Sequence, residues 1–160
     1  MNISISIVDL IQAMLAPGIM ISACGLLLLG MNNKYSLVVN RIRLLNEERR
    51  RLFLRAADRD FSYEENIRME SIALQLRKLT FRVKLVRNAV LSYTSAVALF
   101  VITSLFIGVQ YFFKRMEDLS YAVIILFLLG MVSVLVGVIY AAIETKEGYS
   151  IIHLEVRIDE

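Results

Sequence analysis

The sequence predicts an all-α, polytopic membrane protein with three transmembrane helices and a cytoplasmic antiparallel helical hairpin. Two observations lead to this fold class. The chain of 160 residues is 58% hydrophobic, and its apolar residues gather in three uncharged blocks separated by a stretch rich in arginine. It also contains only one proline and seven glycines, which leaves few positions for turns and irregular loops. This composition excludes an ordinary soluble domain, in which about half of the residues are apolar.

The first predicted element, residues 1–33, is an outer N-terminal segment followed by a transmembrane helix. The uncharged stretch from Leu10 to Met31 is long enough to cross a hydrocarbon core of ~30 Å at ~1.5 Å per residue. Pro17 predicts a kink or a break within this stretch, because proline lacks a backbone donor and clashes with the preceding turn. Ser6 and Asp9 have the spacing of a capping box, which predicts a short interfacial helix before the break.

The next segment, residues 34–88, is polar but periodic, and we expect it to form a cytoplasmic helical hairpin, called the stalk below. Apolar residues recur in it at alternating spacings of three and four, as in the seams of coiled coils. The two seams are Tyr35, Val38, Ile42, Leu45, Arg49 and Leu52, and Met69, Ile72, Leu76, Leu79, Val83, Val86 and Val90. Ser62 and Glu65 form a capping box, and no helix breaker follows before Phe112, which predicts one continuous helix.

Two arrangements of these seams remain open. The seams either pack against each other within one chain or join neighbouring chains, and the sequence pattern alone does not separate the two. We favour the intramolecular hairpin, with the remaining faces in contact with neighbours. The first membrane helix is expected to continue through Asn32 and Asn33 into the first seam.

The second and third transmembrane helices are predicted at residues 89–113 and 119–143, joined by an outer turn at 114–118. The tail, residues 144–160, is expected to form an amphipathic cytoplasmic helix that lies along the stalk. Its apolar set is Ile151, Leu154 and Ile158.

Charge counting predicts the orientation of the chain in the membrane. Of the 18 Lys and Arg residues, none lies in residues 1–33 and fourteen lie in 34–87, while the outer turn and the tail have two each. By the positive-inside rule, the N-terminus is outside and the stalk and the C-terminus are inside. The stalk's seven Asp and Glu residues leave it at +7, which attracts anionic lipid headgroups, whereas no base-reading motif indicates nucleic acid.

The sequence offers little for catalysis. Cys24 and His153 are its only cysteine and histidine, which excludes an internal disulfide, a Cys- or His-cluster zinc site and a Ser-His-Asp triad within one chain. The sequence also lacks a glycine-rich phosphate loop and a nucleophile with an adjacent base. We therefore expect no catalytic residue, no metal site and no cofactor, and we do not expect an enzyme.

Polar and small residues in the spans are the candidate functional residues. Polar groups in a membrane helix either line a wet path or bond a neighbouring helix, and the second role is the commoner. The pore-lining candidates are Ser92, Ser95, Thr103 and Gln110 on the second span and Ser22 on the first, and the candidates for close helix packing are Gly18, Ser22, Ser133, Gly137 and Ala141. Glu144 adjoins the third span and is predicted to pair with Arg87 at a similar depth, because an unpaired charge near lipid is costly.

Short motifs spread over nearly the whole chain carry a family resemblance. They are Pro17, Ser22-Ala23, Leu26–Leu29, Asn32-Asn33-Lys34-Tyr35, Arg41-Ile42-Arg43, Arg77, Arg82, Arg87-Asn88 and Ala142-Ile143-Glu144. In order and spacing, the chain resembles an uncharacterised family of small bacterial integral membrane proteins, the domain of unknown function DUF2721. The resemblance implies a bacterial membrane protein with three membrane helices and a cytoplasmic helical insert, and it implies no activity.

Two functions are consistent with these features. The first is a homo-oligomeric membrane protein that conducts ions, because three helices are too few to enclose a pathway within one chain. The second is a non-conducting scaffold or accessory subunit whose basic stalk docks another protein. The sequence identifies no protein partner.

Overall fold

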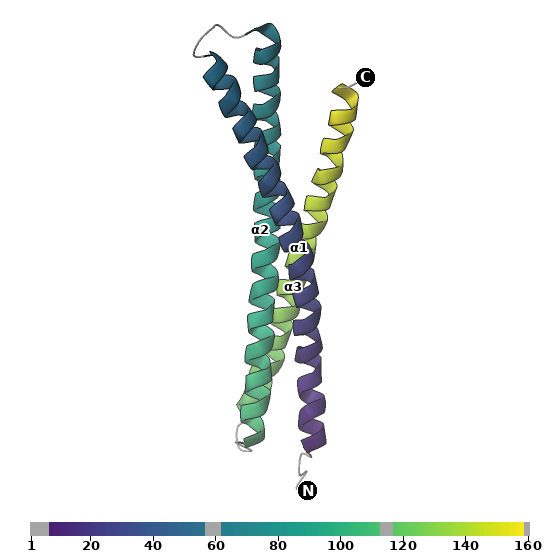
Figure 1. The fold of residues 1–160 in the computed structure, drawn as a ribbon. Helices are drawn as coiled ribbons and strands as arrows, with labels where there is room; N and C mark the ends of the chain where they lie inside the picture. The colour runs from purple at the N-terminus through teal and green to yellow at the C-terminus, as the bar shows by residue number, and fades with distance from the viewer. Residues whose placement is uncertain (1–6, 57–61, 113–116, 159–160) are drawn as a thin grey trace. The chain divides into compact units, whose positions relative to one another are not determined.

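The computed structural model describes residues 7–56, 62–112 and 117–158, and all of these residues except Ser62 are helical (Figure 1). The helices are α1 (Ile7–Ala56), α2 (Tyr63–Phe112) and α3 (Glu117–Ile158). Each contains a segment long and apolar enough to cross a membrane. The predicted all-helical chain with three apolar helices is therefore confirmed.

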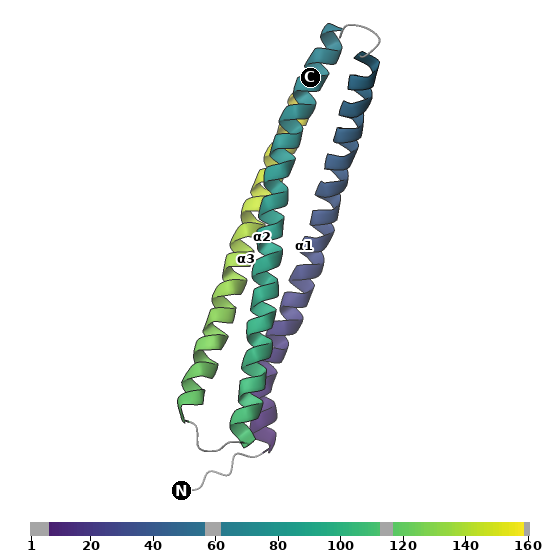
Figure 2. The same ribbon diagram turned by 90° about the vertical axis from the view of Figure 1, so that its left-hand side faces the viewer.

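Helix α1 continues without interruption past Pro17 and through Asn32 and Asn33 (Figure 2). Of the kink or break expected at Pro17, the break, with a separate short helix before it, is therefore wrong, while the kink stays a prediction. A proline removes only one helical hydrogen bond, and a helix in a membrane tolerates this where its neighbours satisfy the freed backbone group. Pro17 is buried among other side chains, which is consistent with such support. Ser6 of the expected capping box lies outside the described residues.

Helix α2 is one uninterrupted helix over the predicted range. Its start has the expected capping contact, because the backbone N–H of Ser62 donates to Glu65 Oε2 at 3.0 Å. The carbonyl of Ser62 accepts the backbone N–H of Asn66 at 3.1 Å, which is the first helical bond. The second residue of the capping box thus satisfies a donor that a bare helix start leaves without a partner.

Helix α3 joins two elements that we expected to be separate. The predicted third span and the predicted tail form a single helix, with no turn near residue 144. The segment around Ala142-Ile143-Glu144 contains no proline, and Gly148 does not interrupt it.

The helices contribute to two compact units, each of which contains part of all three. The first unit comprises the chain up to Met31 together with Asn88–Tyr140. Its centre is a buried cluster of Cys24, Ala96 and Phe100, with the rings of Phe100 and Phe127 at 5.5 Å between centroids. The first unit thus contains most of the apolar residues of the predicted spans.

Two glycines of α3 allow this close packing in the first unit. A Cβ atom on Gly130 would lie 2.7 Å from the ring of Phe100, and one on Gly137 would lie 2.6 Å from the ring of Tyr93. Both distances are too short for a carbon–carbon contact. These two positions therefore admit aromatic rings of α2 only because they carry no side chain.

The second unit comprises Asn32–Arg87 and Ala141–Glu160. Predicted seam residues of α1 and α2 form its buried cluster, and further seam residues pack on it. The buried members are Val38, Leu45, Ile72 and Leu79, and the partly buried ones are Ile42, Leu52, Leu76 and Val83. On each helix, about one residue in every three or four is thus buried or partly buried, as in a seam between two packed helices.

An ion pair joins the same two helices in the second unit. Arg68 donates to Glu48 through two nitrogens, at 2.8 and 3.1 Å. The hydrogen bond from Arg68 lowers the pKa of the Glu48 carboxyl below its ordinary value. The pair is partly exposed, so its contribution to stability is small, but it shows which levels of α1 and α2 lie beside each other.

Candidate functional site

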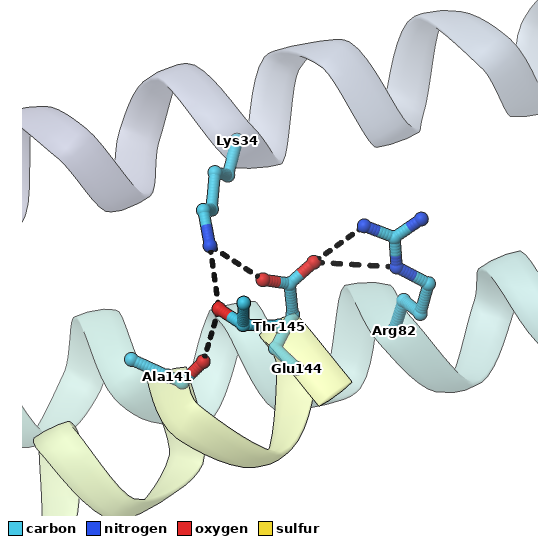
Figure 3. A network of polar contacts seen from close by, with 5 residues as sticks. All are labelled: Lys34, Arg82, Ala141, Glu144 and Thr145. Atoms are coloured by element: carbon cyan, nitrogen blue, oxygen red, sulfur yellow. Dashed lines mark hydrogen bonds and ion pairs between the residues drawn. The ribbon is translucent and has the colours of Figure 1, made fainter. Parts of the chain in front are cut away.

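The most distinctive polar feature of the second unit is a buried carboxylate, Glu144, held between two cations (Figure 3). Lys34 of α1 donates to Glu144 Oε2 at 2.9 Å, and Arg82 of α2 donates to Glu144 Oε1 through Nη2 at 2.6 Å and Nε at 3.2 Å. Both carboxylate oxygens are thus bonded. A single side chain of α3 therefore binds both other helices.

Three neighbours on α3 complete this arrangement, which we call the Glu144 cluster. Lys34 Nζ also donates to Thr145 Oγ1 at 2.9 Å, and the Thr145 hydroxyl donates to the carbonyl of Ala141 at 2.9 Å. Gly148 lies one turn after Glu144, and a Cβ atom there would lie 2.9 Å from Nη2 of Arg82. Gly148 thus leaves the space that the guanidinium occupies.

The charges of the cluster explain how a carboxylate can be buried there. A lone buried charge costs several kcal/mol, and the cost is offset only when ion pairs and hydrogen bonds replace water around it. The side chain of Glu144 is 1% exposed, while those of Arg82 and Lys34 are 21% and 43% exposed. The two cations therefore satisfy the carboxylate and keep part of their own hydration, and the three groups together carry +1.

The geometry of the Glu144 cluster suits a structural role rather than a catalytic one. A carboxylate whose two oxygens both accept charged hydrogen bonds is poorly placed to act as a general base. Within the described residues, no group of three His, Cys, Asp or Glu side chains is placed to hold a metal ion. The cluster clamps three helices together at one level of the second unit.

The polar residues predicted on α2 make most of their contacts within the first unit. Ser95 and Ser133 share a hydrogen bond at 2.7 Å, and the Ser133 hydroxyl is also within 2.9 Å of the Ser92 carbonyl. The buried hydroxyl of Thr103 donates to the Leu99 carbonyl of its own helix at 2.7 Å. The structure thus brings Ser92, Ser95 and Ser133 together.

Further towards the end of α2, Gln110 donates to the hydroxyl of Ser120 on α3. The Ser92 hydroxyl donates to the Asn88 carbonyl at 2.9 Å within α2. These four predicted residues of α2 therefore either link it to α3 or bond to its own backbone.

The small residues predicted for packing divide into two groups. Gly137 and Ser133 contact α2. Gly18 and Ser22 of α1 are instead exposed; the Ser22 hydroxyl donates to the Gly18 carbonyl at 3.2 Å, and a Cβ atom on Gly18 would meet nothing within 4 Å. Ala141, in the second unit, is half-buried. Gly18 and Ser22 therefore do not pack against the other two helices of their own chain.

A family model described as a protein of unknown function, DUF2721, matches residues 14–154. The chain belongs to this family. No curated protein and no solved structure matches this DUF2721 protein. The match covers all three helices and includes Lys34, Arg82 and Glu144.

In this DUF2721 protein, Glu144 has two partners that we did not predict. The sequence pointed to Arg87, whereas the structure pairs Glu144 with Lys34 and Arg82. Arg82 and Arg87 are five residues apart, so they differ by about 140° around a helix of 3.6 residues per turn. Depth estimated by counting residues does not show which face of the helix a side chain occupies.

A sequence signal for the correct partners does exist. Lys34 follows the first apolar block, just as Glu144 follows the third, so both are the first charged residues beyond a span. Gly148, one turn beyond Glu144, marks a position where a bulky side chain can approach. Each signal is weak alone, which is why the prediction missed Lys34 and Arg82.

Proposed function

We propose that this chain is a subunit of a homo-oligomer of the bacterial cytoplasmic membrane, with its N-terminus outside and its stalk and C-terminus inside. The concentration of fourteen Lys and Arg residues between positions 34 and 87 supports this orientation through the positive-inside rule. Labelling of an Arg59→Cys variant in a Cys24→Ser background tests it. A membrane-impermeant thiol reagent should label this cysteine only after the cells are opened, and efficient labelling of intact cells contradicts the orientation.

We also propose that residues 34–88 form an antiparallel hairpin stalk. The packing of seam residues from α1 and α2 and the ion pair between Glu48 and Arg68 support it.

The observation that best supports a homo-oligomer is the exposed side of α1 in the first unit. Gly18 and Ser22 are exposed there, and Cβ atoms added to Gly18 or Gly25 would meet nothing within 4 Å. In a membrane, small residues favour helix association because they let two backbones approach closely. A face of this kind, left uncovered by its own chain, supports contact with the α1 helix of another subunit.

As the activity of this assembly, we propose ion conduction along an axis lined by α1. The alternative lining, α2, loses support because Ser95 and Gln110 are already bonded to serines of α3. Ser22 then supplies the hydroxyl nearest to the axis, where it can replace part of an ion's hydration shell.

Flux measurements in liposomes test this activity. The purified protein should pass ions, and Ser22→Leu should change the flux because leucine fills the axis with an apolar side chain. Ser95→Leu is the matched control, since Ser95 faces α3 rather than the proposed axis. If Ser95→Leu alters flux and Ser22→Leu does not, α2 lines the path.

A non-conducting scaffold or accessory subunit is the second candidate, and the charge of the stalk favours it. A stalk at +7 offers a docking surface for an acidic protein and attracts anionic lipid headgroups, but it repels cations from an inner mouth. Absence of flux under every voltage, pH and membrane tension tried selects this candidate.

A further inference from the structure

A line of exposed apolar side chains runs along the stalk part of α2. Ile67, Leu74 and Phe81 recur at intervals of seven residues, so they lie on one side of the helix. Their exposed fractions are 52, 57 and 51%. The buried seam residues Ile72 and Leu79 are each two residues away from a member of this line, which places them about 160° around the helix. We call the line Ile67, Leu74 and Phe81 the α2 outer face.

Helix α1 has a corresponding line. Leu37 and Leu44, seven residues apart, are 71 and 54% exposed. We call these two the α1 outer face. The charged residues Arg41 and Arg43 lie between them in the sequence, so hydrocarbon does not cover this face. Clustered apolar side chains left exposed in a charged segment indicate an interaction surface.

The two outer faces have their apolar residues at the same levels of the stalk. The ion pair between Glu48 and Arg68 fixes one common level. From there, Leu44 lies four residues back along α1 and Leu74 lies six residues on along α2. At ~1.5 Å per residue, these two leucines are within about 3 Å of one level. Repeating a step of seven residues on both helices brings Leu37 and Phe81 to a common level as well.

The ends of the two faces carry opposite charges. Arg51 and Arg55 lie seven and eleven residues beyond Leu44, so they continue the α1 outer face, and both are exposed. Arg51 also pairs with Glu47 of its own helix, which leaves Arg55 as the available positive charge at this end. Glu64 and Glu70 flank Ile67 on the α2 face and are also exposed. A positive end on one face and a negative end on the other are complementary, whereas either face against a copy of itself brings like charges together.

We propose that the α1 outer face of one chain packs against the α2 outer face of a second copy of this chain. This inference rests on the proposed homo-oligomer. Copies inserted in one membrane share one orientation, so residues at the same level of the stalk meet across the contact. Because the two contacting faces differ, the contact is heterologous, and its repetition generates a ring if the rotation between copies closes.

Disulfide trapping in membranes tests the contact. Two differently tagged copies, both with Cys24→Ser, are expressed together, one with Leu44→Cys and the other with Leu74→Cys, and are oxidised with copper phenanthroline. A disulfide needs Cβ atoms about 3.5–4.5 Å apart, so we expect a covalent dimer that carries both tags. The matched control pairs Leu44→Cys with Ala73→Cys. Ala73 is exposed at the same level but turned by about 100°, and we expect at least tenfold less dimer.

A charge exchange tests the complementarity separately. Glu64→Arg in the Leu74→Cys copy should lower the yield of covalent dimer roughly two- to fivefold, as expected for one surface pair. Arg55→Glu in the Leu44→Cys copy should restore it. An unchanged yield in the first variant, or no recovery in the second, contradicts the proposed pairing of the two ends.

If something other than this contact covers the two outer faces, the cross-linking result differs. Dimers formed only between two Leu44→Cys copies show a symmetric contact and overturn the proposal, and so does an intramolecular bond between Leu44→Cys and Leu154→Cys of the tail. Equal yields for Ala73→Cys and Leu74→Cys show random collision and also overturn it. If native mass measurement shows an oligomer that does not cross-link, only this contact fails, whereas a monomer overturns the homo-oligomer as well. Liposome flux bears on conduction alone.

Discussion

Replacing Glu144 with glutamine removes a buried charge while keeping the size of the side chain. In the structure, this carboxylate accepts hydrogen bonds from Lys34 and Arg82. The variant leaves both cations without their shared counter-charge. Arg82 is the more affected of the two, because its side chain is 21% exposed and that of Lys34 is 43% exposed.

The expected loss of stability follows from this difference in exposure. Breaking a buried ion pair by removing one partner costs about 3–5 kcal/mol, whereas an exposed pair contributes about 0–1 kcal/mol. Water around Lys34 compensates part of the change, so we expect the lower end, about 3 kcal/mol. For a chain of this size, each kcal/mol corresponds to ~2–4 °C, so the apparent Tm should fall by roughly 6–12 °C.

Thermal stability in detergent, followed by the fraction of protein that remains monodisperse on size-exclusion chromatography after heating, measures this loss. Glu47→Gln is the matched control, since Glu47 is also bonded to an arginine, at 2.6 Å, but is 54% exposed. It should change stability by less than about 1 kcal/mol. If Glu144→Gln is as stable as Glu47→Gln, the burial of the cluster does not stabilise the protein and the argument is wrong.

The double variant Glu144→Leu/Arg82→Met should lose less stability than the two single variants combined. The reason is that it removes both charges of the Arg82–Glu144 pair and leaves neither of these two without the other.

Three further predictions concern packing and helix continuity. Gly137→Ala should destabilise the protein by about 1–3 kcal/mol in the same heating assay, because its methyl group would overlap the ring of Tyr93. Gly108→Ala meets nothing within 4 Å and should be neutral or slightly stabilising. Ser133→Ala should cost about 0.6 kcal/mol, typical of a hydrogen bond between membrane helices, and a loss above ~2 kcal/mol in the heating assay contradicts this role. Leu79→Pro should unfold the middle of α2 at a cost of ~3 kcal/mol or more, measured as lost helical circular dichroism, and unchanged ellipticity and stability contradict a continuous helix there.

Hydropathy and periodicity predict the helices well because these signals add up over many residues. Helix α2 is an example, since its capping box and the absence of breakers determine both its start and its length. The break expected at Pro17 does not occur, because the local effect of proline competes with helix-forming residues on both sides and with burial against neighbours. In a membrane, a break in the helix also leaves several backbone groups without hydrogen-bond partners, which costs more than the one hydrogen bond that proline removes.

The contacts of the candidate site are less predictable than its residues. Glu144 is recognisable from the sequence as a charge next to a span, but its partners depend on the rotation of three helices about their axes. An error of one residue in register turns a side chain by about 100°, enough to exchange one partner for another. The same uncertainty applies to Ser95, whose sequence position does not distinguish a pore from the contact with Ser133 that the structure shows.

The seam between α1 and α2 limits how the length of the stalk can change during evolution. Removing seven residues from α1 alone would shift Leu45 by two turns relative to its seam partners on α2 and would separate Glu48 from Arg68. The helix itself would remain intact. A deletion of seven residues from each helix preserves both the seam and the facing pairs. Natural length variants and engineered shortened stalks should therefore lose or gain the same multiple of seven residues in α1 and in α2. A deletion in one of these helices should appear only together with a compensating deletion in the other.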